Sequence, residues 1–289
     1  MKLFAVVVTY NRVSELKNTL LHIQEQGIAP SSILVINNNS TDDTRLVLGN
    51  EFPSVQTFHL SENIASAGGF ALGMQESVKQ GADWVWLFND DSRPLSGALQ
   101  AAAPHFSGAV GKPLGLLKIG ERSGEGISTL LNWKGVRVPV TVPISNDLTD
   151  TDLITFDGCF ISRKLIETIG VCDPLFFMGT YEFDYCLRAH DAGFRICTLP
   201  NGLLADSKLG SAKGTPPWRQ YYNTRNHLWL GIHRRSFEII KAWFIRESKY
   251  TIAIILKGDQ KWQRLLYKYR AIRDALLNRR GKRYHPDLN

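Results

Sequence analysis

Two adjacent carboxylates follow an apolar run in the segment WVWLFNDD, residues 84–91. Like charges repel at this distance, so Asp90 and Asp91 need a positive group between them. One use of such a pair is to hold Mg²⁺ or Mn²⁺ together with the phosphates of a substrate, because hard cations prefer oxygen ligands. The same residues could instead make a helix cap and a turn before Pro94, and the doublet alone leaves both interpretations open.

A second pair of acids, Glu182 and Asp184, stands in the segment YEFDYCLR. We expect both at the first turn of a helix, where negative charge is favoured. A carboxylate at that place is predicted to stay ionised, as a general base requires. Asp184 and Arg188 are four residues apart and could equally form an ordinary ion pair on the helix surface.

Strand and helix patterns alternate along the N-terminal part of the chain. Residues 3–10 are a continuous apolar run, typical of a strand buried on both faces. Residues 11–27 follow with apolar positions at helical spacing, and further strands are predicted at 33–36, 55–60 and 84–88. This alternation predicts an α/β fold with a doubly wound, mostly parallel sheet.

Ligands of such sheets bind beyond the carboxyl ends of the strands. Four polar segments follow predicted strands and should meet at that edge: residues 9–12, 37–40, 63–69 and 89–91. The first pair of acids therefore lies where a ligand is expected.

The rest of the chain has a different character. Residues 94–155 predict loops and an antiparallel hairpin at GVRVPVTVPI, and helices rich in Tyr, Trp and Arg follow Pro216. We therefore divide the chain into a first domain, residues 1–210, and a helical extension, residues 211–289. Residues 206–289 hold 19 Lys and Arg against 6 Asp and Glu, whereas residues 1–205 hold 15 against 21. Such a basic segment seeks an anionic membrane surface, nucleic acid or a phosphorylated ligand, unless it is only a solvated helical face.

Several features argue for a cytoplasmic protein. The four cysteines have no C-x-x-C spacing, which favours reduced thiols. The N-terminal apolar run is too short for a signal peptide. The most apolar later window is broken by Arg246, Glu247 and Lys249, so no membrane span is predicted.

The chain resembles the glycosyltransferase family 2 enzymes in TYNR, VINNNSTDDT, ENIASAGGFALG and WLFNDDS, in this order, and in the segment from FDGCF to AGFRI. The resemblance covers roughly residues 1–210 and implies the GT-A fold, a Rossmann-like nucleotide-sugar-binding architecture. The NxxxAGGFxxG run, YYNTRN and AIRDALLNRRGKR are similar to the bacterial rhamnosyl- and galactofuranosyl-transferase branch, which builds surface polysaccharides such as O-antigen and capsule.

This resemblance implies a nucleotide site at the ends of the first two strands. Thr9, Tyr10 and Arg12 would surround the base and ribose, and Arg12 could meet a phosphate. Asn37 stands where the family usually has an acid that accepts the pyrimidine N3–H, and its amide oxygen can accept that bond without charge. Asn39 belongs to the same run of asparagines, for which a polar turn is the alternative.

Asn63, Gly68 and Gly69 match the family's loop beside the nucleotide and donor sugar. Glycine there would let the backbone approach a ligand closely. The alternative for the two glycines is an ordinary helix-entry turn. Asp90 would also face the donor.

The family's catalytic groups match the acids described above. Asp90 and Asp91 correspond to the D-x-D-like element that binds the metal ion, Mn²⁺ or Mg²⁺, with Asp91 the stronger candidate. Glu182 takes the place of the general base, and Asp184 would orient Arg188 or a sugar hydroxyl. Many relatives carry a metal-binding His some twenty residues later, where this chain has LLADSKLGS, so Asp206 could substitute for it.

Together these matches imply an inverting, metal-dependent transfer of galactofuranose or rhamnose. The donor would be a UDP- or dTDP-linked sugar, the acceptor lipid-linked or an oligosaccharide, and the extension would dock on the inner face of the cytoplasmic membrane. A catalytically inactive nucleotide-sugar-binding protein is a second hypothesis, against which the retained acids argue. A nucleic-acid-binding protein is favoured only by the basic extension, and we expect no nucleic-acid partner.

Overall fold

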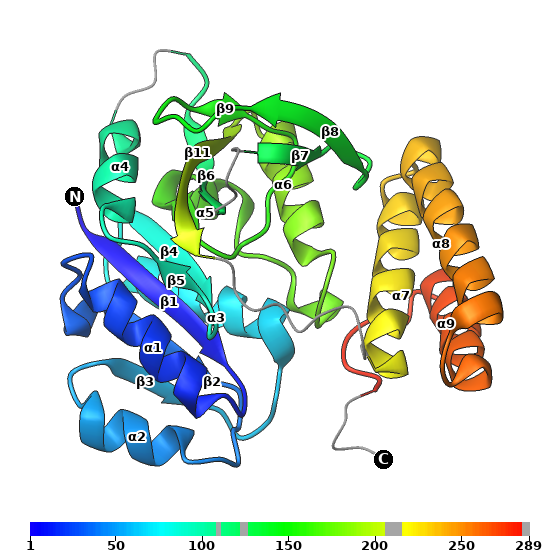
Figure 1. Ribbon diagram of the computed structural model, residues 1–289, viewed down its shortest axis with the longest axis horizontal. Coiled ribbons are helices and arrows are strands. Elements are labelled where there is room, and N and C mark those ends of the chain that lie inside the picture. Colours follow the sequence, from blue (N-terminus) through cyan, green and yellow to red (C-terminus); the bar gives the residue numbers. More distant parts are fainter. Residues whose placement is uncertain (108–110, 122–126, 206–215, 285–289) are drawn as a thin grey trace.

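The computed structural model describes residues 1–107, 111–121, 127–205 and 216–284 (Figure 1). Its strands are β1 (Leu3–Thr9), β2 (Ile33–Asn37), β3 (Gln56–His59), β4 (Trp84–Asn89), β5 (Arg93–Pro94), β6 (Leu114–Glu121), β7 (Ile127–Leu131), β8 (Arg137–Val142), β9 (Thr149–Asp150), β10 (Cys159–Ser162) and β11 (Arg195–Ala205). Its α-helices are α1 (Val13–Gln24), α2 (Thr44–Glu51), α3 (Ala65–Lys79), α4 (Ala98–Ala102), α5 (Arg163–Ile169), α6 (Tyr181–Asp191), α7 (Pro217–His233), α8 (Phe237–Lys257) and α9 (Lys261–Leu276). Short 3₁₀ helices are η1 (Pro30–Ser32), η2 (Ala103–Phe106) and η3 (Pro174–Phe176).

The main sheet has the strand order β3-β2-β1-β4-β10-β6-β11-β5, and β9 pairs with β11. Strands β1 to β4 are parallel, as the alternating pattern predicted. Strand β10 runs antiparallel to both β4 and β6, whereas β6 and β11 are parallel. The prediction of an α/β fold with a mostly parallel sheet is confirmed.

Both faces of the sheet are covered, which explains the continuous apolar runs of its strands. In β1, Phe4, Val6 and Val8 belong to the core on the side of α3 and α6. Ala5 and Val7, which point the other way, pack in the core that contains buried residues of α1, α2 and α4. Alternation of side chains along a strand produces this division.

The segment 94–155 contains the predicted hairpin, formed by β7 and β8, with Leu130 opposite Val138. It also contains β6, which the sequence analysis did not predict although the strand is buried at the centre of the sheet. Two glycines and Lys118 interrupt its apolar run, and this interruption concealed the strand.

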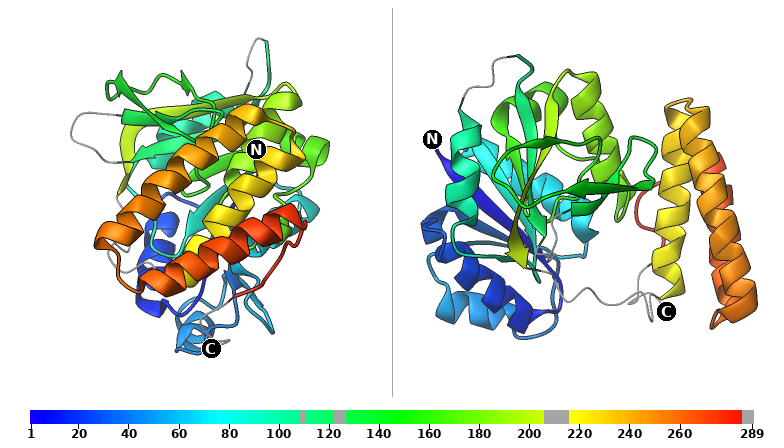
Figure 2. Two further views of the ribbon diagram at one scale, coloured as in Figure 1. Left: turned by 90° about the vertical axis from the view of Figure 1, so that its right-hand side faces the viewer. Right: turned by 45° about the horizontal axis from the view of Figure 1, so that its top comes forward.

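Helices α7, α8 and α9 form a layer beside the sheet domain (Figures 1 and 2). Helix α7 packs against both α8 and α9, and Tyr221 Oη donates to Asp274 Oδ2 at 2.8 Å. The segment after α9 returns to η3, where the Gly281 amide donates to the carbonyl of Leu175 at 2.8 Å. Among the helices that the structure describes, none is long and apolar enough to cross a membrane.

The glycines of α3 allow this helix to approach the sheet closely. A β-carbon on Gly69 would lie 2.7 Å from Val8 Cγ1, and one on Gly73 would overlap with Val6 Cγ1. Gly68 is also buried, against the side chain of Ile64. The Cβ directions of Gly68 and Gly69 thus face packed protein, while Gly68 also lines a cavity together with Asn63 and Ile64, so their role beside a ligand stays a prediction.

We expect Gly73→Ala to destabilise the protein by about 1–3 kcal/mol, because the methyl group overpacks the contact between α3 and β1. Gly49→Ala is the matched control: Gly49 also lies inside a helix, but no atom stands within 4 Å of its added β-carbon. That change should stabilise by about 0.4–1 kcal/mol. Urea unfolding measures both, and equal effects of the two substitutions would contradict the packing role of Gly73.

Candidate active site

The carboxyl ends of β1, β2 and β4 lie side by side. Thr9 is paired with Asn37 in the β1–β2 register, and Val8 is paired with Asn89 in the β1–β4 register. The polar residues that follow these strands therefore meet at one edge of the sheet, as predicted.

Arg12 supplies the positive group between the two adjacent acids. Its Nη1 donates to Asp90 Oδ1 at 3.2 Å and to Asp91 Oδ2 at 2.7 Å. Asp90 is buried and also accepts a hydrogen bond at 2.9 Å from Thr9 Oγ1 and one from the Tyr10 amide. Burial raises the pKa of Asp90 to about 6, against the opposing effects of Arg12 and Thr9.

Asp90 and Asp91 could supply only part of the ligand set of a divalent cation. Within the described part of the chain, no three His, Cys, Asp or Glu side chains come together as a ligand set. Mg²⁺ is commonly held by only one or two carboxylates plus substrate phosphates, and this arrangement is what Asp90 and Asp91 could supply. Asp91 is the more accessible of the two, with 17% of its side chain exposed against 9% for Asp90. Asp206, the third predicted ligand, lies outside the described residues.

The asparagine run has mainly local partners. Asn37 Oδ1 accepts from the Ser40 amide at 2.9 Å, so the oxygen expected to meet a base is engaged in a turn. Asn38, which the sequence analysis did not single out, is buried and bonds the Ile64 amide and the Ala65 carbonyl. Asn39 is exposed in a left-handed conformation, with φ of 61°.

Asn63 is buried and shapes the start of α3. Its Oδ1 accepts from the Ala65 amide at 2.8 Å, and Ala65 has φ of 55°. The side chains of Asn38 and Asn63 thus hold the loop that joins β3 to α3.

Asp157 was missed by the sequence analysis, although it lies between the two predicted groups of acids. It precedes β10, the neighbour of β4, and its Oδ1 accepts from Ser92 Oγ and, at 3.2 Å, from the Asn89 amide. Desolvation raises the pKa of Asp157, and the negative charge of Asp91 adds to this effect. The signal in the sequence was an acid directly before a strand, in FDGCF.

Lys118 is the buried cation of this region. Its Nζ donates to Thr155 Oγ1 at 2.6 Å and to the Asp157 carbonyl at 3.1 Å, and it pairs with Glu121. Its charge opposes the rise of the pKa at Asp157 and at Glu182. A single lysine inside the apolar run LGLLKIG was the signal that could have indicated it.

Glu182 stands in the first turn of α6, as predicted, and its Oε1 accepts from the Phe156 amide at 3.1 Å. Desolvation is the largest effect on this carboxyl and raises its pKa, with a further increase from Asp157. The helix terminus was expected to favour the ionised form of Glu182, whereas desolvation acts on its pKa in the opposite direction. A raised pKa suits a general base, which works best near the operating pH.

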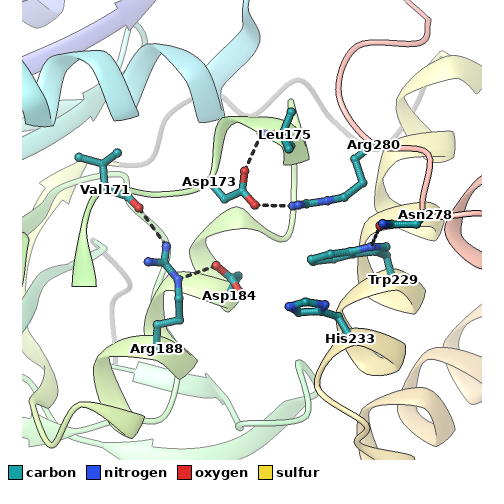
Figure 3. Close-up of a pocket in the computed structure, with 9 residues that line it drawn as sticks. All are labelled: Val171, Asp173, Leu175, Asp184, Arg188, Trp229, His233, Asn278 and Arg280. Atoms are coloured by element: carbon teal, nitrogen blue, oxygen red, sulfur yellow. Dashed lines mark hydrogen bonds and ion pairs between the residues drawn. The ribbon is translucent and has the colours of Figure 1, made fainter. Parts of the chain in front are cut away.

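Asp184 belongs to the same helix but has different partners from Glu182. Its Oδ2 accepts from Arg188 Nε at 2.8 Å, which is the intrahelical ion pair left open by the sequence. Figure 3 shows this pair at a cavity of about 640 Å³ between α6, α7 and the segment after α9. Other residues at the cavity include Asp173, Arg280 and Trp229. The structure thus separates Asp184 from the group formed by Glu182, Lys118 and Asp157.

Comparison with known proteins identifies the fold and the class of enzyme. Residues 4–109 match the model described as Glycosyl transferase family 2. The chain carries a glycosyl transferase family 2 domain. It is 28% identical over 232 residues to galactofuranosyltransferase GlfT1 of Mycolicibacterium smegmatis, which covers 77% of this chain and 75% of that protein. It is 25% identical over 244 residues to dTDP-rhamnosyl transferase RfbF of Shigella flexneri, which covers 78% of each.

Solved glycosyltransferase structures share the fold. The mannosyltransferase PcManGT from Pyrobaculum calidifontis, in complex with GDP-Man and Mn²⁺, matches with a TM-score of 0.59 and 13% identity over 96% of this chain and 87% of that one. S. aureus TarS 1-349, in complex with UDP-GlcNAc, matches with a TM-score of 0.63 and 15% identity over 96% and 81%. The predicted GT-A fold is confirmed, and the chain is a glycosyltransferase.

Replacing Lys118 tests the balance of charge in this site. We expect Lys118→Met to destabilise the protein by about 1–3 kcal/mol at pH 8, because buried acceptors lose their donor and two desolvated carboxylates lose a cation. The loss should shrink at pH 5, since the raised pKa values let Asp157 and Glu182 take up protons in the folded state. Lys17→Met, which removes an exposed pair with Glu51, should cost under about 1 kcal/mol at both pH values. Urea unfolding at the two pH values measures the difference, and a pH-independent loss for Lys118→Met would contradict this account.

Proposed function

We propose that this glycosyltransferase moves galactofuranose or rhamnose from a UDP- or dTDP-linked donor to a hydroxyl group of a glycan, with inversion at the anomeric carbon. The observation that carries the proposal is the set of acids at one edge of the sheet. Asp91 and Glu182 both lie within electrostatic reach of Asp157. The names of the two curated relatives support the choice of sugar.

The donor diphosphate would enter beside Asp91 and Arg12. The guanidinium of Arg12 is partly exposed, so it can turn from the two carboxylates to a phosphate. That movement would leave Asp91 and Asp90 free to hold Mg²⁺ or Mn²⁺, which would neutralise the charge on the departing diphosphate. Thr9, whose hydroxyl is bonded to Asp90, would orient that carboxylate and would not contact the nucleotide directly.

The remaining predicted residues would form the walls of the nucleotide site. Tyr10 and the exposed Asn39 would face the base and ribose. Asn37 would keep its turn, and Asn63 would fix the loop beside the donor. Asp184 would act through Arg188 and would not touch the reacting atoms.

Glu182 would accept the proton of the attacking hydroxyl. As the acceptor oxygen bonds to the anomeric carbon, the bond from that carbon to the diphosphate breaks and the proton passes to Glu182. This single displacement inverts the anomeric centre. The Phe156 amide would hold one carboxylate oxygen in place and leave the other directed at the acceptor.

Removing the charge of Glu182 is the most direct test of its role as the base. Glu182→Gln should lower kcat by about 10²- to 10⁴-fold, because the amide keeps the size of the side chain and loses its basicity. Donor affinity, measured by calorimetry with Mn²⁺, should stay within about twofold. Asp91→Ala, in contrast, should lose Mn²⁺-dependent binding of the nucleotide. Asp184→Asn should reduce kcat less than Glu182→Gln. An active Glu182→Gln beside an inactive, folded Asp184→Asn would transfer the role of the base to Asp184.

A donor panel distinguishes this proposal from the two other functions. UDP- and dTDP-sugars, each with and without Mn²⁺, should raise the melting temperature, and more so for tighter binding, because the stabilisation grows as RT ln(1 + [L]/Kd). Binding without transfer to any acceptor would favour an inactive nucleotide-sugar-binding protein. Retention on nucleic acid without any effect of the donors would favour a nucleic-acid-binding protein.

We further propose that α8 and α9 dock on an anionic membrane that carries the acceptor. The left view of Figure 2 shows the side of the molecule on which these helices lie. Each of the two helices exposes a stripe of large apolar side chains. We call these stripes the outer face: Phe237, Phe244, Ile245, Ile252, Ile255 and Leu256 on α8, and Trp262, Leu266, Tyr269 and Leu276 on α9.

Composition and charge indicate a bilayer as the partner of the outer face. Phe244 is 64% exposed and Trp262 is 85% exposed, with Lys257 and Lys261 exposed near them. Aromatic and aliphatic side chains beside lysines are typical of helices that lie in a membrane interface. Anionic headgroups would attract the lysines, and the rings would enter the acyl boundary.

The outer face should bind vesicles that contain phosphatidylglycerol, and 0.5 M salt should weaken this binding without abolishing it, because apolar burial is not screened. Phe244→Ser with Trp262→Ser should weaken the salt-resistant part by roughly tenfold or more. Leu46→Ser, which changes an equally exposed residue on α2, is the control and should have no effect. Co-sedimentation measures all three proteins. Full release by salt, or unchanged binding of the double variant, would contradict insertion of these rings.

A further inference from the structure

We propose that Arg225 and Asn226, in the YYNTRN segment of α7, position the catalytic base by clamping the loop that leads into α6. The proposal rests on the role of Glu182 given above. We call the loop of residues 176–180 the base loop, because Glu182 follows it by two residues. The clamp belongs to the helical extension, whereas the base belongs to the first domain.

Asn226 holds the base loop through three carbonyl groups. Its Nδ2 donates to the carbonyls of Phe176 at 2.9 Å, Met178 at 2.8 Å and Gly179 at 3.0 Å. Asn226 is 2% exposed, so these bonds do not compete with solvent. The two N–H bonds of one amide group are thus shared among three carbonyls that lie within four residues of the base loop.

Arg225 bonds both Asn226 and the base loop. Its Nε donates to Asn226 Oδ1 at 2.8 Å, its Nη2 to the Phe176 carbonyl at 3.1 Å and its Nη1 to the Gly281 carbonyl at 2.8 Å. The guanidinium is buried and stands 4.9 Å from the centre of the Tyr222 ring. The guanidinium thus joins Asn226, the base loop and the segment after α9 in one hydrogen-bonded group.

The base loop needs such partners because its backbone is strained. Phe177 has φ of 66° and Thr180 has φ of 68°, conformations that are sterically unfavourable for a residue with a side chain. The carbonyl of Phe177 also accepts a hydrogen bond at 3.1 Å from the amide of Ala67, in the first turn of α3. This turn follows the loop of Asn63, which we propose to lie beside the sugar donor. The clamp therefore fixes a loop that touches the donor side at one end and carries the base at the other.

A positioning role and a purely structural role predict different kinetics. We expect Asn226→Ala to lower kcat by about 10- to 100-fold with donor KM within about threefold, because a displacement of the base by about 1 Å is enough for such a loss. Thr224→Val is the matched control: Thr224 is buried in the same helix, but it donates to Glu247 on α8. It should lower the melting temperature without changing kcat. A folded Asn226→Ala with normal kcat, or an equal loss of kcat in both variants, would overturn the proposal.

A double-mutant cycle shows whether Asn226 acts through the base. In the Glu182→Gln background, Asn226→Ala should change the residual kcat less than twofold, because the group that it positions no longer takes the proton. The same fold-loss in both backgrounds would overturn the proposal. If Asn226→Ala does not fold, Asn226→Ser keeps one donor and replaces it in the cycle. An active Glu182→Gln would refute the proposed base itself, whereas an inactive Glu182→Gln beside a normal Asn226→Ala would refute only the clamp.

Discussion

The rest of the site has to compensate for negative charge that is buried at the carboxyl edge of the sheet. Asp90, Asp157 and Glu182 are all desolvated, and each has a raised pKa for that reason. Two cations moderate this cost from opposite sides of β4: Arg12 faces the doublet, and Lys118 lies next to Asp157 and Glu182. The two cations therefore offset part of the cost of burying these carboxylates.

The sequence was sufficient for those parts of the fold where one local pattern determines one element. The β-branched run of β1 and the helical spacing of α1 predicted both elements and placed the polar segments at one edge. Strand β6 escaped prediction because its burial depends on partners distant in the chain, β10 and β11, and its own residues include Lys118. Asp157 escaped for a similar reason, since only the antiparallel pairing of β10 with β4 brings it beside Asn89.

Side-chain roles were harder to predict than side-chain positions. Glu182 lies where the motif placed it, but its pKa follows from desolvation and from Asp157, neither of which the motif contains. The adjacent glycines of α3 illustrate the same limit. Their sequence is compatible with a ligand loop, and only the tertiary structure shows that a side chain on Gly69 would collide with Val8. A motif specifies which residues are present, whereas their partners come from the tertiary structure.

The hydrogen bond between Gly281 and Leu175 has a consequence for biosynthesis. A ribosome adds about 5–20 residues per second, so on the order of ten seconds separate the synthesis of these two residues. The partners of the strained loop on α7 are made about halfway through that interval, and its partner in the segment after α9 is made only at the end of it. The strands of the sheet, which end at residue 205, can therefore assemble before the segment that bonds Leu175 has been synthesised.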